Sequence, residues 1–455
     1  MWSILPDPLL VNVFSFLSAR DLTVSGMVCS RWRGVSLSRS LWRRRLQVDY
    51  KIQSFPEEMR PCYKEYRRLV NLGNVRHSKV IEEQADEVWH LSFSHDGALL
   101  AAAGKEGRLT VWNVSDVERL EMLWQLDARK PPIDGFQLMY VEFSPGDHYL
   151  LSVSRDCSYT QLAIICNAKT GNICHVVRNV RGCPTWFNSS WMVTSYLQNV
   201  LDVVPRRLLI ITILDVGNLQ KMCTDFRVDT SQLRVDVVRA SLEFHIIHPL
   251  RHCRVIHPRQ HQRMLFCQLF MSTVDHFASV KIASDASGIP LHVPHRQDNV
   301  TESLQSQFDC IVPLDRHSHA EGVVVSHDES KIIATIMRQN GKIRDVRLSI
   351  YDVVTLQLLH TLPTENMAHP SRAYYLHPGI TEKLVACGSD SGVIHIWEQT
   401  HRIEIGQLRG HKGTCNAVTF CPDRPHVMAS AGDDHTVRIW CFQHTGIQLT
   451  MKDSN

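Results

Sequence analysis

The chain lacks the local motifs by which most enzymes are recognised. It has no P-loop, no G-x-S-x-G elbow, no H-E-x-x-H pair and no G-x-G-x-x-G dinucleotide motif. Each of these motifs supplies a phosphate cradle, a nucleophile or a metal site that its reaction needs. We therefore predict a non-catalytic protein with no catalytic residue, no metal and no cofactor.

The 14 cysteines form no recognisable framework. They lack the C-x-x-C pairs of a zinc site and the dense spacing of a secreted disulfide protein. We expect reduced thiols, most of them buried in a core.

The chain also lacks a long uninterrupted apolar run near its N-terminal end. No basic residue precedes the first apolar stretch, and it is interrupted by Pro6, Asp7, Pro8, Asn12 and Arg20. A signal peptide or a membrane span would need a continuous apolar segment. We expect no membrane contact, and a cytoplasmic protein that can also reach the nucleus.

The charge is nearly balanced over the whole chain but uneven along it. The net charge of the 455 residues is +3, whereas residues 1–80 hold 14 Lys and Arg against 6 Asp and Glu, a net of +8 that leaves −5 for the remainder. Residues 43–45 are the sharpest basic run. This excess would suit an acidic protein surface or nucleic acid, and a solvated helix face explains the run equally well.

The first 46 residues contain a dense apolar pattern. Asp7 and Pro8 suit the N-cap and first position of a short helix, and Asp21 suits the cap of a second one. A segment of about 40 residues rarely buries so many apolar side chains within itself, so we predict that this surface binds a partner. The alternative is packing on the rest of the chain. The candidate residues are Leu5, Pro6, Leu9, Leu10, Val13, Phe14, Leu17, Val28, Cys29, Trp32 and Trp42.

The register of these residues resembles an F-box. About a dozen positions agree in residue type over forty residues, from the Leu5-Pro6 pair to Trp42. The resemblance implies that residues 1–47 dock a Skp adaptor.

A different texture begins near residue 81, where short β-type runs alternate with turn residues. The best unit contains Gly410-His411, the runs 418–422 and 428–434, and 437–440. It resembles a WD-repeat blade, a four-stranded antiparallel sheet. We predict that His411, Ser430, Asp434 and Trp440 share hydrogen bonds in its interior, where buried polar groups need partners, and that their role is structural.

The unit recurs along the chain. A second one ends at Trp397, 43 residues before Trp440, which matches the period of about 40 to 45 residues in such repeats. Further units include 88–97 with 111–112, 141–145, 322–328 and 348–352. We predict an all-β propeller over residues 76–455, with seven blades, because a closed ring protects the sheet edges.

The repeat signal is degenerate over about 176–310. Residues 208–214 and 265–270 are expected to form buried strands, and 284–299 a loop. This region holds His245, His248, His252, Cys253, His257 and His261. Zinc could use such ligands, but the spacing lacks paired cysteines. A polar insertion or blade surface is favoured, and nucleic-acid binding is disfavoured because no aromatic platform accompanies the basic residues.

Residues 48–75 are predicted to be a helical linker. The helix begins either at Pro56 or at Pro61, since proline is favoured in the first turn.

With both parts in place, the chain resembles the F-box/WD-repeat family. The resemblance implies a substrate-recognition subunit of a cullin-RING (SCF-type) E3 ubiquitin ligase, in which the propeller holds a protein substrate. A non-degradative WD-repeat scaffold is the alternative. Some WD-repeat receptors join cullin-4 ligases through Trp-Asp-x-Arg, which is absent at 397–400, 440–443 and 112–115.

Substrate contacts are expected on one rim of the propeller. Loops that flank the turn positions converge there from several blades. The candidates are Lys105, Arg155, Lys412 and Thr414.

Overall fold

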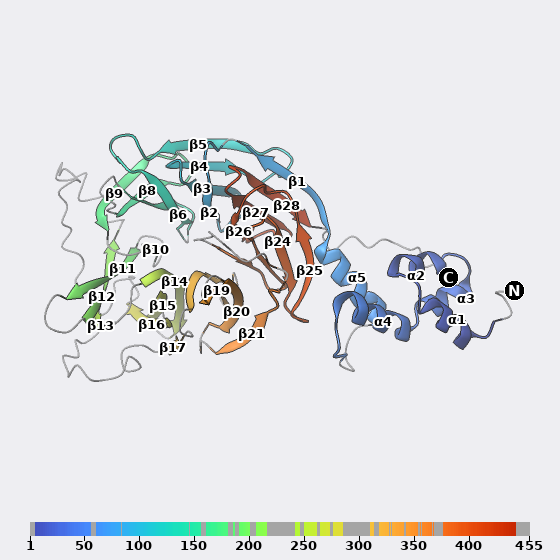
Figure 1. Ribbon diagram of the computed structural model, residues 1–455. Coiled ribbons are helices and arrows are strands. Elements are labelled where there is room, and N and C mark those ends of the chain that lie inside the picture. The colour runs from blue at the N-terminus through green and yellow to red at the C-terminus, as the bar shows by residue number, and fades with distance from the viewer. Residues whose placement is uncertain are drawn as a thin grey trace.

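A computed structural model describes the fold of most of the chain. The described residues are 5–55, 61–82, 84–144, 146–155, 161–180, 185–186, 191–200, 206–215, 242–245, 250–261, 264–273, 276–284, 310–313, 318–326, 328, 330–340, 343–353, 355, 357–365, 367 and 376–442. Between residues 178 and 322 only the strands are described, without their side chains. Figure 1 shows a helical unit at one end of the molecule and a ring of sheets at the other.

Within residues 5–55 and 61–82, five helices form the N-terminal unit: α1 (Asp7–Phe14), α2 (Ala19–Ser25), α3 (Ser30–Ser36), α4 (Arg39–Tyr50) and α5 (Cys62–Gly73). The expected caps are displaced by a few residues. Pro6 is the N-cap of α1, and Ser18 rather than Asp21 caps α2, with the Ser18 hydroxyl accepting from the Asp21 N–H at 3.2 Å. Asp21 has the third position of a capping box instead, because a serine already stands three residues before it.

The linker helix α5 begins after Pro61, so the later of the two predicted starts is the right one. Proline fixes its own backbone near φ −65° and lacks an N–H, which suits the position just before a helix.

The strands that the structure describes group into seven four-stranded sheets, here called blades 1 to 7. Blade 1 is β2 (Val88–Phe93), β3 (Leu99–Gly104), β4 (Arg108–Asn113) and β5 (Glu121–Asp127); blade 2 is β6 (Gln137–Phe143), β7 (Tyr149–Arg155), β8 (Gln161–Asn167) and β9 (Ile173–Val180). Blade 3 is β10 (Thr185–Trp186), β11 (Trp191–Val200), β12 (Arg206–Asp215) and β13 (Leu242–His245); blade 4 is β14 (Leu250–His261), β15 (Met264–Thr273), β16 (His276–Ser284) and β17 (Cys310–Pro313).

Blade 5 is β18 (Ser318–Val325), β19 (Lys331–Asn340), β20 (Ile343–Asp352) and β21 (Leu358–Leu362). Blade 6 is β22 (Gly379–Ile380), β23 (Leu384–Cys387), β24 (Ile394–Glu398) and β25 (Ile403–Leu408). Blade 7 combines β26 (Cys415–Phe420), β27 (Val427–Gly432) and β28 (Val437–Phe442) with β1 (Val75–Ile81). The seven-bladed propeller predicted from the repeats is therefore confirmed.

The ring is closed by two strands from distant parts of the chain, which pair with each other. Strand β1 pairs antiparallel with β28, with Val80 opposite Arg438 and Ile81 opposite Val437. The propeller therefore starts with the outer strand of the last blade, and the first inner strand is β2. This pairing covers an edge that blade 7 would otherwise expose.

The degenerate middle of the sequence forms two ordinary blades. The expected strands at 208–214 and 265–270 are β12 and β15. The prediction for the histidine-rich segment is a polar insertion or a blade-top surface. Residues 250–261 form β14, which pairs with β15, so they are part of a blade and not an insertion. The loop expected at 284–299 lies almost entirely outside the described residues, since only Ser284 is described, as the last residue of β16.

Apolar side chains pack both within the ring and within the helical unit. Between blades 7 and 1, Phe93 and Trp112 pack with Ala429 and Ile439. In the helical unit the buried core includes α5 and consists of Leu10, Phe14, Leu22, Val35, Leu41, Trp42, Leu46, Ile52, Cys62 and Leu69. Residues 5–55 therefore complete their core with the linker helix.

Candidate interaction surfaces

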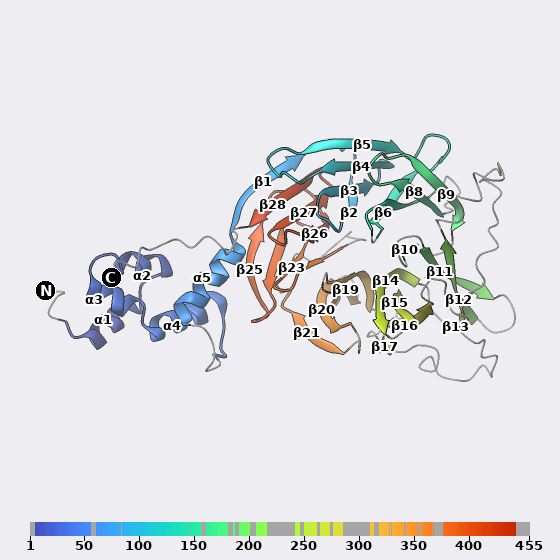
Figure 2. The ribbon, with the colours of Figure 1, turned by 180° about the vertical axis from the view of Figure 1, so that it is seen from behind.

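The helical unit joins the propeller through a buried ionic cluster. Arg68 on α5 donates to Glu65, one turn away, and to Glu398 at the end of β24, at 3.0 Å. His401 Nε2 lies 3.0 Å from Glu65 Oε1. The side chain of Glu398 is 0% exposed. Both views place α5 beside blade 6 (Figures 1 and 2).

The surroundings of Glu65 in this cluster favour its charged form. Burial alone would raise the pKa of Glu65, but hydrogen bonds from His401 and Arg68, together with their positive charge, lower it to about 2. A charged carboxylate that accepts such bonds is favoured over the neutral acid.

Apolar packing reinforces this contact between α5 and blade 6, here called the joint. Ile403 and Ile405 of β25 pack against the helical core, and Leu72 of α5 belongs to a core cluster of the propeller. A Cβ on Gly73 would lie 2.9 Å from the Ile405 carbonyl oxygen, so the helix approaches β25 as closely as only glycine permits. The helices and the ring are thus one packed body at this point.

Three of the residues predicted to bind an adaptor lie inside the helical unit. Leu10 is 0% exposed, and Phe14 and Trp42 are each 2% exposed. The Trp42 indole N–H donates to the Ser36 carbonyl at 2.6 Å, and its ring lies 4.9 Å from that of Tyr63 on α5. Their role is to support the surface from behind, because side chains this buried offer a partner no contact.

Most of the other predicted adaptor-binding residues are exposed or half-buried. Leu9, Val13 and Val28 are exposed, at 51%, 40% and 64%. Pro6 is also exposed, whereas Leu5 and Leu17 are half-buried.

Two predicted residues have local roles. Cys29 caps α3, its sulfur accepting from the Trp32 N–H at 3.4 Å. The Trp32 ring is half-buried and packs edge-on against Phe14, 5.2 Å between centroids.

On α2 and in the turns after α1 and α2, sequence reasoning missed three large exposed side chains. They are Phe16, Val24 and Met27, with exposures of 78%, 52% and 70%. Together with Leu9, Val13 and Val28 they give the helical unit six exposed apolar residues on α1, on α2 and in the turns that follow these helices, here called the apolar surface. An exposed apolar patch on a small domain indicates a protein partner.

The four predicted blade residues form one chain of hydrogen bonds. The Trp440 indole N–H donates to Ser430 Oγ at 2.8 Å, Ser430 Oγ lies 2.8 Å from His411 Nε2, and His411 Nδ1 lies 2.8 Å from Asp434 Oδ1. Burial would raise the pKa of Asp434, but the hydrogen bond and charge of His411 hold it well below its usual range.

The predicted rim residues come from several blades, and their side chains differ in contacts and exposure. Lys105 is held by Glu87 and Asp86, at 2.9 and 3.5 Å, and the Thr414 hydroxyl donates to Asp390 at 3.2 Å. Lys412 is exposed. The side chain of Arg155 lies outside the described residues.

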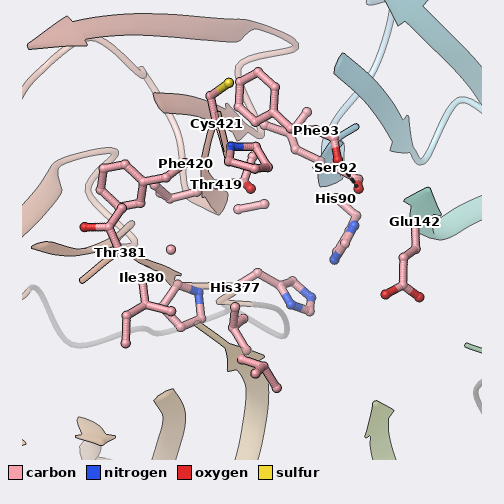
Figure 3. Close-up of a pocket in the computed structure, with 18 of the residues that line it drawn as sticks. His90, Ser92, Phe93, Glu142, His377, Ile380, Thr381, Thr419, Phe420 and Cys421 are labelled. Atoms are coloured by element: carbon pink, nitrogen blue, oxygen red, sulfur yellow. Dashed lines mark hydrogen bonds between the residues drawn. The ribbon is translucent and has the colours of Figure 1, made fainter. Parts of the chain in front are cut away.

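A cavity of about 300 Å³ lies in the central opening of the ring. Inner strands of blades 1, 2, 5, 6 and 7 contribute to it, and Figure 3 shows His90, Glu142, His377 and Thr419 around the space. No predicted site residue lines it.

Neither a metal-ligand cluster nor a membrane-spanning helix is found in the part of the chain that the structure describes. There, no group of three or more His, Cys, Asp or Glu side chains could hold a metal ion. The side chains between His245 and His261 lie outside that part. None of the described helices has the length and apolar character needed to span a bilayer.

Comparison with known families agrees with this architecture. The F-box-like family model matches residues 2–47, and the model of the WD domain, G-beta repeat, matches residues 76–113 and 403–441. The helical unit, the seven blades and these matches define a protein that combines an F-box-like domain with WD repeats.

The similarity extends over nearly the whole chain for one kind of protein. F-box/WD repeat-containing protein 5 of Rattus norvegicus is 21% identical over 96% of this chain and 94% of its own length, and that of Homo sapiens is 22% identical over the same shares. WD repeat-containing protein 26 homolog of Drosophila melanogaster is 23% identical over 80% of this chain and 47% of its own length.

Proposed function

We propose that this chain is the non-catalytic substrate-recognition subunit of a cullin-RING (SCF-type) E3 ubiquitin ligase. The helical unit docks a Skp adaptor and through it the cullin scaffold, while the propeller holds the protein to be ubiquitylated. The observation that carries the proposal is the apolar surface, which remains uncovered although the helices already have a complete core with α5. Such a surface costs solubility unless a partner covers it.

The joint supports the same role. A receptor has to hold its substrate at a fixed distance from the adaptor, and α5 is bound to blade 6 by buried charges and by apolar packing. Glu398 follows Trp397 at the blade end where a Trp-Asp-x-Arg signature would stand, and Arg68 covers it. Because Glu398 is buried beneath Arg68, we favour attachment of the chain to a ligase through the F-box-like helices over attachment to a cullin-4 ligase through this blade end.

The substrate face is proposed to be the propeller rim that carries Lys105, Lys412 and Thr414. Of these, Lys412 has the most open side chain and is the strongest candidate for steering a charged partner. The protein is proposed to act in the cytoplasm, with access to the nucleus.

One experiment separates a ligase subunit from a non-degradative scaffold. The full-length tagged chain is expressed in cells, and the recovered material is tested for a Skp adaptor and for a cullin. Recovery of both supports the proposal. Recovery of the adaptor without any cullin would favour a scaffold, and recovery of neither would overturn the assignment of the helical unit.

A further inference from the structure

The helical unit carries a positive charge that its own carboxylates do not neutralise. Residues 5–55 and 61–73 contain 11 Lys and Arg against 4 Asp and Glu. Each of the four acids already bonds within the unit; the pairs are Asp7 with Arg31, Asp21 with Ser18, Asp49 with Arg45 and Glu65 with Arg68. The remaining cations are therefore left to solvent or to a partner.

Three of these cations lie on α4 at positions that helix stability does not favour. Arg39, Arg43 and Arg44 are all exposed. Arg39 is in the first turn of α4, where the positive end of the helix dipole disfavours a cation, and that turn holds no acidic residue. Arg39 and Arg43 are four residues apart, a spacing at which like charges repel each other. The stability of α4 does not account for these arginines, so they indicate a role in binding.

Arginines border the apolar surface at two places. The guanidinium carbon of Arg44 lies 5.7 Å from the centre of the Phe16 ring. On α3, the exposed Arg33 donates from Nε to the carbonyl of Gly26 at 3.4 Å, and Gly26 directly precedes Met27. Because Phe16 and Met27 both belong to the apolar surface, this surface is continuous with positive charge at both places.

The contacts of these arginines position the guanidinium groups and leave their charge unneutralised. The guanidinium carbon of Arg43 lies 4.7 Å from the centre of the Phe55 ring, and Arg44 Nη1 donates to Ser15 Oγ at 3.3 Å. Arg45 differs, since its charge is paired within α4. Within residues 5–55 and 61–82, four exposed arginines have no carboxylate partner and border or extend the apolar surface, here called the basic margin: Arg33, Arg39, Arg43 and Arg44.

We infer that the protein covering the apolar surface carries carboxylates around its own apolar contact, and that the basic margin binds them. An apolar centre with a charged rim is the usual anatomy of a protein–protein interface. A nucleic-acid backbone would match the arginines but would leave the apolar side chains between them uncovered. The inference deepens the proposed function and rests on it in taking this partner to be the Skp adaptor.

The test measures how fast the full-length chain associates with a purified Skp adaptor at several salt concentrations. We expect the association rate constant to fall at least about tenfold between about 0.05 and about 0.5 M salt, because salt screens the charges that guide encounter. An association rate that does not change over this range would overturn the inference and leave the proposed function standing. Absence of adaptor binding at every salt concentration would overturn both.

A charge-reversed variant then locates the effect. Arg39→Glu with Arg43→Glu should lower the association rate constant at low salt about tenfold and weaken its salt dependence, with little change in the dissociation rate. Glutamate in the first turn suits the helix dipole, so the variant should keep the melting temperature of the wild type. Lys130→Glu with Lys169→Glu makes the same change in net charge at exposed positions that follow β5 and β8, and should associate like the wild type. Equal rates for the two variants would overturn the inference, because net charge alone would then set the rate.

A short DNA duplex tests the other class of anionic partner in the same assay. We expect the wild type and the charge-reversed variant to bind it equally weakly. Duplex binding that the variant loses, together with an unchanged rate of adaptor association, would overturn the inference and assign the basic margin to nucleic acid.

Discussion

The guanidinium of Arg68 on α5 lies 3.0 Å from the carboxylate of Glu398, 330 residues further along the chain at the end of β24. The pair joins the helical unit to the propeller at a point where Glu398 is fully buried and Arg68 is mostly buried. A buried ion pair contributes little when it is compared with an apolar replacement, but loss of one partner leaves the other charge unpaired. The joint therefore depends on both residues being present.

Arg68→Ala should destabilise the whole protein. Glu398 is 0% exposed, and breaking a buried pair commonly costs about 3 to 5 kcal/mol. Thermal unfolding of the full chain is the measurement, and a clear fall in Tm is expected. Arg31→Ala is the control, since Arg31 pairs with Asp7 at the surface and such pairs contribute only about 0 to 1 kcal/mol. Similar Tm values for the two variants would contradict the importance of the joint.

Acid should weaken the same joint through Glu65. The pKa of this carboxyl falls from an ordinary 4.5 to about 2 in the folded protein, so its contribution to stability is complete above pH 4.5 and disappears as the pH falls toward 2. The shift corresponds to about 3 kcal/mol. Urea unfolding at several pH values should show wild type losing more stability over this window than Glu65→Gln. Parallel pH curves would show that Glu65 does not carry the effect.

The repeats predicted the propeller because each blade repeats a short set of local signals. Trp397 and Trp440 stand 43 residues apart, and the same turn residues recur around them. The predicted propeller range begins at residue 76, one residue after the start of β1, but the pairing of β1 with the last blade was not predicted, because a lone seven-residue strand before the first repeat has no local mark of the blade it joins. Its partner β28 lies at the other end of the ring.

The helical pattern predicted an interaction surface but not which apolar residues form it. Leu10 and Phe14 lie four residues apart, as do Leu9 and Val13, so α1 carries two adjacent apolar stripes. Only tertiary packing, which includes the contact of Phe14 with Trp32 of α3, decides that the first stripe is buried and the second exposed. The ionic joint was invisible for the same reason, since nothing in the sequence links Arg68 to Glu398.

Substitutions in the exposed stripe should remove adaptor binding without unfolding the protein. Leu9→Asp with Val13→Asp places two charges on the apolar surface, where both side chains are at least 40% exposed. Loss of an interface anchor costs about 2 kcal/mol or more, so adaptor recovery should fall more than about thirtyfold. Leu358→Asp, at an exposed position of β21 in blade 5, should have no effect.

Binding and stability are measured together for this pair. An unchanged melting temperature with lost adaptor recovery is the expected result for the double variant. Full recovery with both charges in place would move the adaptor surface away from α1.

The hydrogen-bonded chain in blade 7 should act on stability before it acts on binding. Asp434→Ala removes the acceptor of His411 Nδ1, of the Lys412 N–H and of the Thr436 hydroxyl. Leaving buried donors unsatisfied costs about 1 to 3 kcal/mol. The melting temperature should therefore fall, whereas Asp423→Ala in an exposed turn should leave it unchanged. If Asp434→Ala impaired partner binding at an unchanged melting temperature, Asp434 would belong to a recognition site, because a purely structural residue cannot affect binding without affecting the fold.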